Sequence, residues 1–196
     1  SMEAINTQAL RLLRLFGNTT SKRVTPSVGA EQEYFLVDKE KYMQRKDLVY
    51  TGRTLFGAMP PKGQELDDHY FGTIRQRIAS FMRDVNIQLW KVGVPAKTQH
   101  NEVAPAQHEI DFKFSGANEM ADCVMTFKMA VRTIAKRHGL HATFMPKPRA
   151  EVNGSGMHIH FALYKDGKNI FTDTSAEDGL SKEAYHFMAG IIQHIK

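Results

Sequence analysis

The segment Val28–Asp38, which reads VGAEQEYFLVD, constrains the fold more than any other part of the chain. It ends in four consecutive apolar residues, a pattern typical of a strand that is buried on both faces. Glu31 and Glu33 are two residues apart, so a strand places both carboxylates on one face. A lone pair of this kind is more often a solvated edge, but two carboxylates beside a buried run are costly unless cations offset their repulsion.

The segment Val152–His160 (VNGSGMHIH) combines two glycines with two histidines. Gly154 and Gly156 permit a backbone turn and let a ligand approach the main chain closely. If Met157–Leu163 is a strand, its side chains alternate between two faces. One face then carries the imidazoles and the other packs apolar groups: His158 and His160 on the first, Met157, Ile159 and Phe161 on the second. Imidazoles beside an approachable backbone suit a metal or phosphate site.

The segment Val94–Phe114 is predicted to form two strands around a bend at Pro105. Glu102 and Glu109 lie on either side of this bend. A hairpin-like reversal would bring both carboxylates to one place, although their spacing alone does not establish it. Lys113 is a candidate for a neighbour that neutralises them.

Apolar residues at helical spacing predict four amphipathic helices, at 5–16, 72–93, 118–138 and 181–196, with Asn118 as the N-cap of the third. A short strand, Leu140–Met145, and an Asp-Gly turn at Lys165–Lys168 complete the pattern. This alternation indicates an α+β fold with helices packed on a mainly antiparallel sheet. We expect an N-terminal helix and linker at 1–27 and a partial catalytic domain at 28–196.

The segment Lys39–Tyr70 shows no clear period and is expected to be a long loop, which is more often functional than idle. It carries a small acidic cluster of Glu65, Asp67 and Asp68. These carboxylates are compatible with a cation, but a surface turn is the stronger interpretation.

Composition and charge limit the classes of partner that we expect for this chain. The net charge is +5, yet the basic residues are scattered and form no dense tract with interleaved aromatics, so we expect no nucleic-acid partner. No apolar run is long enough to cross a bilayer, and no membrane partner is expected. The single cysteine, Cys123, excludes an intrachain disulfide framework and fits a small buried residue in a reducing cytoplasm.

The acidic and imidazole side chains of the three segments favour a hard divalent cation. Carboxylate oxygens select Mg²⁺ or Mn²⁺, and one added imidazole is compatible with either ion, whereas structural zinc would call for cysteines. Such cations serve phosphoryl transfer because they neutralise charge on the transferred group. The chain has neither a phosphate-binding P-loop nor a dinucleotide-binding glycine motif.

The same three segments resemble motifs of the glutamine synthetase family. GAEQEYFLVD resembles its first carboxylate motif, HNEVAPAQHE its second, and FMPKPRAEVNGSGMHIH its signature around the ATP-binding region. The part up to about Val103 is similar to type III enzymes, and the part from about Ala104 is similar to bacterial type I enzymes. Ala162 stands where the type I motif usually has serine, which removes one hydroxyl from the nucleotide side.

The resemblance implies a role for each matched residue. Glu33, Glu102 and Glu109 would hold the metal that positions glutamate, and Glu31 and His158 the metal on the phosphate side. His160 would contact nucleotide phosphate, while Asn153 and the Gly154 backbone would bind glutamate. The expected catalytic acid and arginines belong to a C-terminal part of the family that this chain does not include, so no catalytic residue is assigned.

The family forms glutamine from glutamate, ammonia and ATP through γ-glutamyl phosphate, with Mg²⁺ or Mn²⁺, and its full-length members are expected to be homo-oligomers. The resemblance therefore implies an incomplete core of an ATP-dependent ligase, with weak metal binding and little or no turnover by itself. The alternative is a non-catalytic assembly module that keeps the scaffold for contacts with other subunits. A nucleic-acid binder ranks third and rests on the isoelectric point alone.

Overall fold

The structure is a computed structural model that describes residues 2–57 and 62–196. It divides into two compact units, one that extends to Ile159 and one formed by His160–Lys196. The expected domain boundary between residues 27 and 28 remains a prediction. Within the described residues, no helix is both long and apolar enough to cross a membrane.

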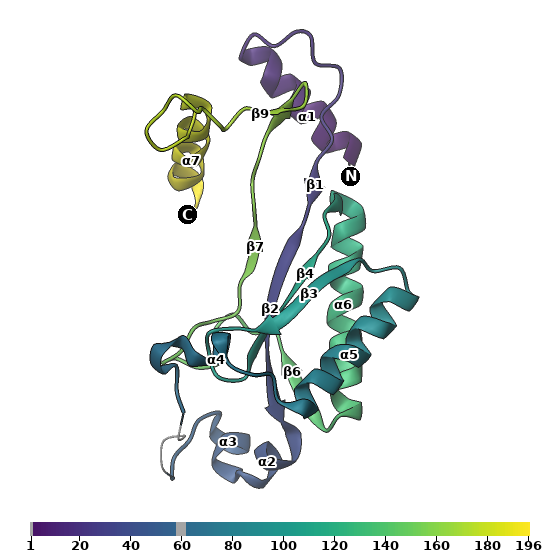
Figure 1. Ribbon diagram of the computed structural model, residues 1–196, viewed down its shortest axis with the longest axis vertical. Coiled ribbons are helices and arrows are strands. Elements are labelled where there is room, and N and C mark those ends of the chain that lie inside the picture. The colour runs from purple at the N-terminus through teal and green to yellow at the C-terminus, as the bar shows by residue number, and fades with distance from the viewer. Residues whose placement is uncertain (1, 58–61) are drawn as a thin grey trace. The chain divides into compact units, whose positions relative to one another are not determined.

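An antiparallel five-stranded sheet forms the centre of the first unit (Figure 1). Its strands are β3 (Ala96–Asn101), β4 (Gln107–Phe112), β2 (Ala30–Asp38), β6 (Leu140–Thr143) and β7 (Met157–Ile159). β4 pairs with one edge of β2, while β6 and β7 pair with different halves of the opposite edge. Both faces of β2 contribute to buried apolar clusters, Ala30, Tyr34 and Leu36 to one and Phe35 to the other, which explains the apolar run in its sequence.

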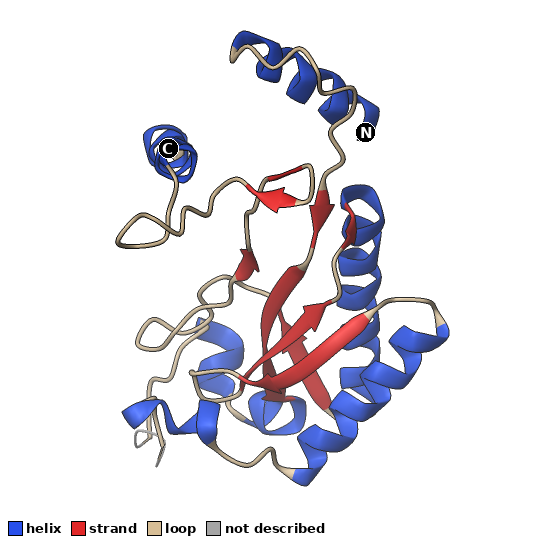
Figure 2. Ribbon diagram, turned by 45° about the horizontal axis from the view of Figure 1, so that its top comes forward, coloured by secondary structure: helices blue, strands red, loops and turns tan. Residues whose placement is uncertain are grey.

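Two long helices, α5 (Gln76–Lys91) and α6 (Ala117–Arg137), cover one face of this sheet (Figure 2). The alternate residues of β2 and β4 that face the helices form the core with the helices' buried stripes. Tyr34, Phe81 and Phe127 are fully buried there and pack edge to face. The opposite face of the sheet carries the polar side chains of β2 and, beside them, a small buried apolar cluster of Phe35, Ala104 and Val152. The α+β prediction is therefore confirmed.

Shorter elements complete the first unit. α1 (Met2–Leu15) begins it, and β1 (Ser27–Val28) pairs with β5 (Ser115–Gly116). Between β2 and α5 lie α2 (Lys39–Gln44), α3 (Lys46–Thr51), η1 (Glu65–Asp67) and α4 (Asp68–Phe71). In the second unit, β8 (Tyr164–Lys165) pairs with β9 (Lys168–Asn169), and α7 (Lys182–His194) follows.

Three expectations about local structure are wrong. Lys39–Tyr70 is not one long loop, because its described parts contain short helices whose single turns are too brief to show a period. Gly116, not Asn118, is the N-cap of α6. The strand that begins at Met157 ends at Ile159, and Met157, Ile159 and Phe161 are exposed instead of buried against the sheet.

Candidate metal centre

The register of the sheet places acidic and imidazole side chains in rows across neighbouring strands. Glu33 on β2 is opposite Glu109 on β4, and Glu109 is opposite His100 on β3. Two residues earlier on β2, Glu31 is opposite Asp111 on β4 and His158 on β7. Because alternate residues of a strand share a face, all these groups lie on the face away from α5 and α6.

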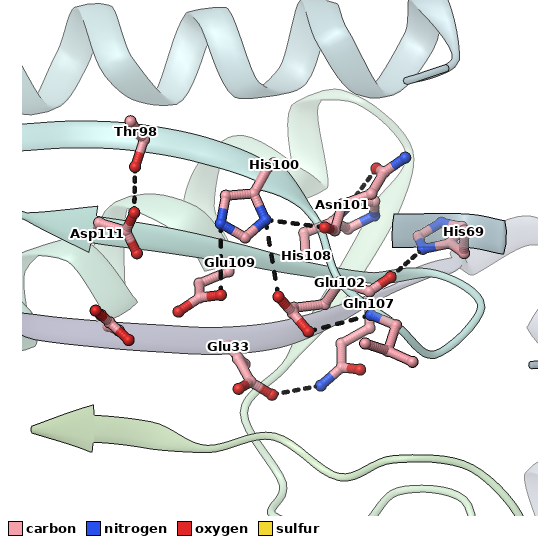
Figure 3. Close-up of polar contacts among 12 residues, drawn as sticks. Glu33, His69, Thr98, His100, Asn101, Glu102, Gln107, His108, Glu109 and Asp111 are labelled. Carbon is pink, nitrogen blue, oxygen red and sulfur yellow. Dashed lines mark hydrogen bonds and ion pairs between the residues drawn. The ribbon is translucent and has the colours of Figure 1, made fainter. Parts of the chain in front are cut away.

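The rows converge into clusters with the spacing of metal ligands. One ligand atom from each of Glu33, Glu102 and Glu109 lies within 4.8 Å of the other two, and the same holds for Glu31, Glu109 and His158. The hairpin between β3 and β4 thus brings Glu102 beside Glu109, as the bend at Pro105 predicted. Figure 3 shows the carboxylates of Glu33, Glu102 and Glu109 gathered on one side of the strands.

Only histidines form ion pairs with Glu33, Glu102 and Glu109 within the described residues. His100 lies between Glu102 and Glu109, 3.8 Å and 3.5 Å from their oxygens. Nδ1 of His158 lies 3.5 Å from Glu33 and 3.9 Å from Glu31. Lys113, the expected neutralising neighbour, is exposed and has no ion pair in the part of the chain that the structure describes.

This arrangement opposes ionisation of the buried carboxyl groups. Burial, together with hydrogen bonding and repulsion from the adjacent Glu102, raises the pKa of Glu109 to about 9. Burial also raises the pKa of Glu33, while the Gly156 N–H opposes this effect and repulsion by Glu102 adds to it. A bound divalent cation would reverse this balance, since it stabilises the ionised carboxylates.

Neutral groups fix the position of Glu33. Nε2 of Gln107, which is completely buried, donates to Oε2 of Glu33 at 2.6 Å and to the Gly154 carbonyl at 2.8 Å. The backbone N–H of Gly156 donates to the same carboxylate oxygen at 3.1 Å. The glycine segment therefore packs directly against β2. These contacts leave Oε1 of Glu33 facing His158.

Space and not backbone angle calls for glycine at position 154, whereas at position 156 the obstacle is the end of an exposed side chain. A Cβ on Gly154 would lie 2.2 Å from the Pro146 carbonyl oxygen, and a Cβ on Gly156 would lie 2.9 Å from the His158 ring. Neither residue has a positive φ. The close approach predicted for these glycines is thus made by the protein's own groups.

Asn153 and His160 belong to none of the clusters with metal-ligand spacing found among the described residues. Asn153 is exposed and forms two hydrogen bonds with Gln64, at 3.0 Å from its side-chain oxygen and 2.8 Å from its backbone N–H. His160 is the first residue of the second unit. The roles of Asn153, Gly154 and His160 stay predictions.

Sequence reasoning missed His100, Gln107 and Asp111. His100, Glu109 and Asp111 form a third cluster within metal-ligand spacing, and Gln107 supports Glu33. A signal was present, because Gln107, Glu109 and Asp111 alternate along β4 on one face. His100 could be found only from the pairing of β3 with β4.

The fold and the site together define a class of protein, an α+β domain whose antiparallel sheet carries helices on one face and a carboxylate-rich site on the other. The family model described as "Glutamine synthetase, catalytic domain" matches residues 11–196. The chain therefore belongs to the glutamine synthetase family, and the matches include type I and type III enzymes.

Individual relatives agree with this assignment. A glutamine synthetase of Butyrivibrio fibrisolvens is 45% identical over 192 residues, which cover 98% of this chain and 27% of the relative. A type-3 glutamine synthetase of Dictyostelium discoideum is 41% identical over 195 residues, 100% of this chain and 26% of the relative. The solved Plasmodium falciparum glutamine synthetase superposes with a TM-score of 0.66 and 28% identity, covering 86% of this chain and 36% of that one. The chain thus spans about a quarter of the length of these two curated relatives.

Proposed function

We propose that this chain forms the metal-holding sheet of an ATP-dependent glutamate–ammonia ligase. The observation that carries the proposal is the convergence of Glu33, Glu102 and Glu109, from separate segments of the chain, within 4.8 Å of one another. The donor set fits Mg²⁺ or Mn²⁺, because it offers carboxylate oxygens with imidazoles beside them. The raised pKa of Glu33 and Glu109 adds support, since these carboxylates lack a compensating positive charge from lysine or arginine within the described residues.

Each residue has a distinct task in the proposed site. Glu33, Glu102 and Glu109 would hold one cation, and Glu31 with His158 a second. When bound, the cations would neutralise charge on glutamate and ATP phosphate oxygens during formation of γ-glutamyl phosphate. Gln107 orients Glu33, and His100 orients Glu102 and Glu109.

We infer the substrates, the cellular location and the oligomeric state from the family. Asn153 and the Gly154 backbone would bind glutamate, His160 would contact ATP phosphate, and ammonia would displace phosphate from the intermediate. We place the protein in the cytoplasm and in a homo-oligomer, and we expect little or no turnover by this chain alone. A robust ligase or γ-glutamyl transferase assay on the 196-residue chain would contradict that last expectation.

A metal titration tests the proposal. Thermal unfolding is followed with EDTA and with increasing Mn²⁺ or Mg²⁺, for the wild type and for Glu33→Gln and Glu102→Gln. When the free cation is present at one hundred times its dissociation constant, binding stabilises the folded state by about 2.7 kcal/mol. This corresponds to a rise in Tm of roughly 5–10 °C. We expect this rise in the wild type and its loss in both variants.

The matched control is Glu119→Gln, which changes an exposed glutamate in the first turn of α6. It should keep the full response to Mn²⁺. In EDTA, the Glu33→Gln and Glu102→Gln variants should lose little or no stability relative to the wild type. Each substitution removes one negative charge from a cluster of carboxylates that repel one another. A wild type that is indifferent to both cations would overturn the proposal and favour the non-catalytic assembly module.

A further inference from the structure

A groove of about 580 Å³ lies on the first unit, along β6 and the adjacent side of α6. Three basic side chains of α6 line it, at positions four residues apart: Lys128, Arg132 and Lys136. Residues 140–145, which include all of β6, line the rest of it. None of these residues belongs to the acidic clusters of the candidate metal centre.

The cations in this groove are available to a partner. Arg132 and Lys136 are exposed, and Lys128 is half-buried. Within the described residues none of the three forms an ion pair, and the groove lining contains no acidic residue. The Phe144 ring lies 5.5 Å from Lys128 Nζ and 5.2 Å from the Arg132 guanidinium carbon, so it holds both charges at one end of the groove.

The strand beside these cations ends the sheet. Among the described strands, β6 pairs only with β2, over Leu140–Thr143. Its other edge therefore presents backbone N–H and C=O groups that a further strand can bind. α6 packs against the sheet beside this strand (Figure 1).

The spacing of the cations matches the repeat of an extended chain. Four residues of an α-helix rise about 6 Å, and two residues of a strand rise about 6.7 Å. Carboxylates on alternate residues of a strand added to β6 would thus meet Lys128, Arg132 and Lys136 in turn. We propose that this groove binds an extended acidic peptide segment of a partner protein, which adds to the edge of β6 and presents its acidic side chains to α6.

A nucleic acid is the competing class of partner. It would meet the same positive charges, but it has no backbone donors and acceptors that pair with a strand edge in sequence. The free edge therefore favours a peptide. The two classes are separated directly in the experiment below.

The test uses the 196-residue chain and a labelled decapeptide, Thr-Glu-Val-Glu-Val-Glu-Val-Glu-Thr-Gly, with binding measured by fluorescence anisotropy. We expect Arg132→Glu and Lys136→Glu each to weaken binding about fivefold or more. Arg137→Glu is the matched control, because Arg137 is an exposed basic residue of α6 that does not line the groove. It should change the affinity less than twofold. All three variants should keep the wild-type response to Mn²⁺, which separates this site from the metal centre.

Two further probes test the recognition mode. A peptide with Gln at each Glu should bind at least tenfold more weakly, and so should an acidic peptide with N-methylated valines, which cannot donate to the strand edge. Equal weakening by Arg137→Glu, or undiminished binding of the N-methylated peptide, would overturn the proposal. A ten-residue oligothymidylate that binds more tightly than the acidic peptide would overturn it in favour of nucleic acid.

Discussion

Gly154 illustrates how one missing methyl group sets the site. A Cβ at this position would lie 2.2 Å from the Pro146 carbonyl oxygen, which is backbone and cannot rotate away. We expect Gly154→Ala to destabilise the first unit by about 2–4 kcal/mol, because the segment that carries the Gln107 contact must shift. Chemical denaturation measures this as a lower midpoint.

The control for this substitution is Gly190→Ala in the interior of α7, where a Cβ would meet nothing within 4 Å. Alanine is the better helix former, so this variant should be unchanged or more stable by roughly 0.5–1 kcal/mol. An unchanged midpoint for Gly154→Ala would show that the glycine segment does not pack as described.

At this scale the sequence predicted which residues carry chemistry but not how they meet. The spacing of Glu31 and Glu33 gave their common face, since alternation along one strand is local. The pairing of Glu109 with His100 depends on the register of β3 against β4, which no local spacing encodes. The support of Glu33 by Gln107 is equally non-local, because 74 positions separate the two residues.

Among the elements, the junction of β2 and α2 depends on Asp38. Its carboxylate accepts the Lys41 N–H at 3.1 Å as the N-cap of α2 and pairs with Arg77 of α5 at 2.7 Å. The hydrogen bond from the Lys41 N–H, and after it the contact with Arg77, hold the pKa of Asp38 below its ordinary value. A depressed folded-state pKa contributes stability that is complete above the unfolded-state pKa, near 4, and is lost as the pH falls through the folded-state value.

We therefore expect Asp38→Ala to lower the Tm by about 2–4 °C at pH 7. The difference from wild type should shrink as the pH falls below about 4, because the Asp38 carboxyl then binds a proton more readily in the unfolded state than in the folded state. Asp122→Ala, on an exposed part of α6, is the control and should change the Tm little at either pH. A difference that stays constant down to pH 2.5 would assign the effect to the loss of packing.

The long, periodic elements were predictable, and the short ones were not. The stripes of α5 and α6 and the apolar run of β2 each extend over enough residues to set a period. The Asp-Gly turn between β8 and β9 was also predictable, because Asp166 and Gly167 both adopt positive φ there. α2 and α3 have six residues each, too few to distinguish a helix from a turn.

For the whole molecule, burial divides unequally between the two units. Of the residues His160–Lys196, only Ser181 and Ala184 are buried, whereas the first unit has an extensive apolar core. A unit of fewer than about 40 residues rarely buries enough surface to be stable by itself. The second unit should therefore open far more easily than the sheet.

Amide hydrogen exchange measures this difference. We expect peptides from α7 to exchange at least about tenfold faster than peptides from β2, β4 and α6, which surround the core. The helix α1 serves as an internal comparison, because it has no buried residue and should also exchange fast. Equal protection of α7 and α6 would contradict the uneven distribution of stability.

The unpaired edge of β6 has a consequence for colloidal behaviour. An open strand is a template on which a second copy of the same chain can assemble, and proteins commonly guard such edges with positive side chains. Two copies that meet at this edge would bring their basic stripes face to face, so mutual repulsion keeps them apart. Since dissolved ions weaken that repulsion, concentrated salt should favour association of two copies through this edge.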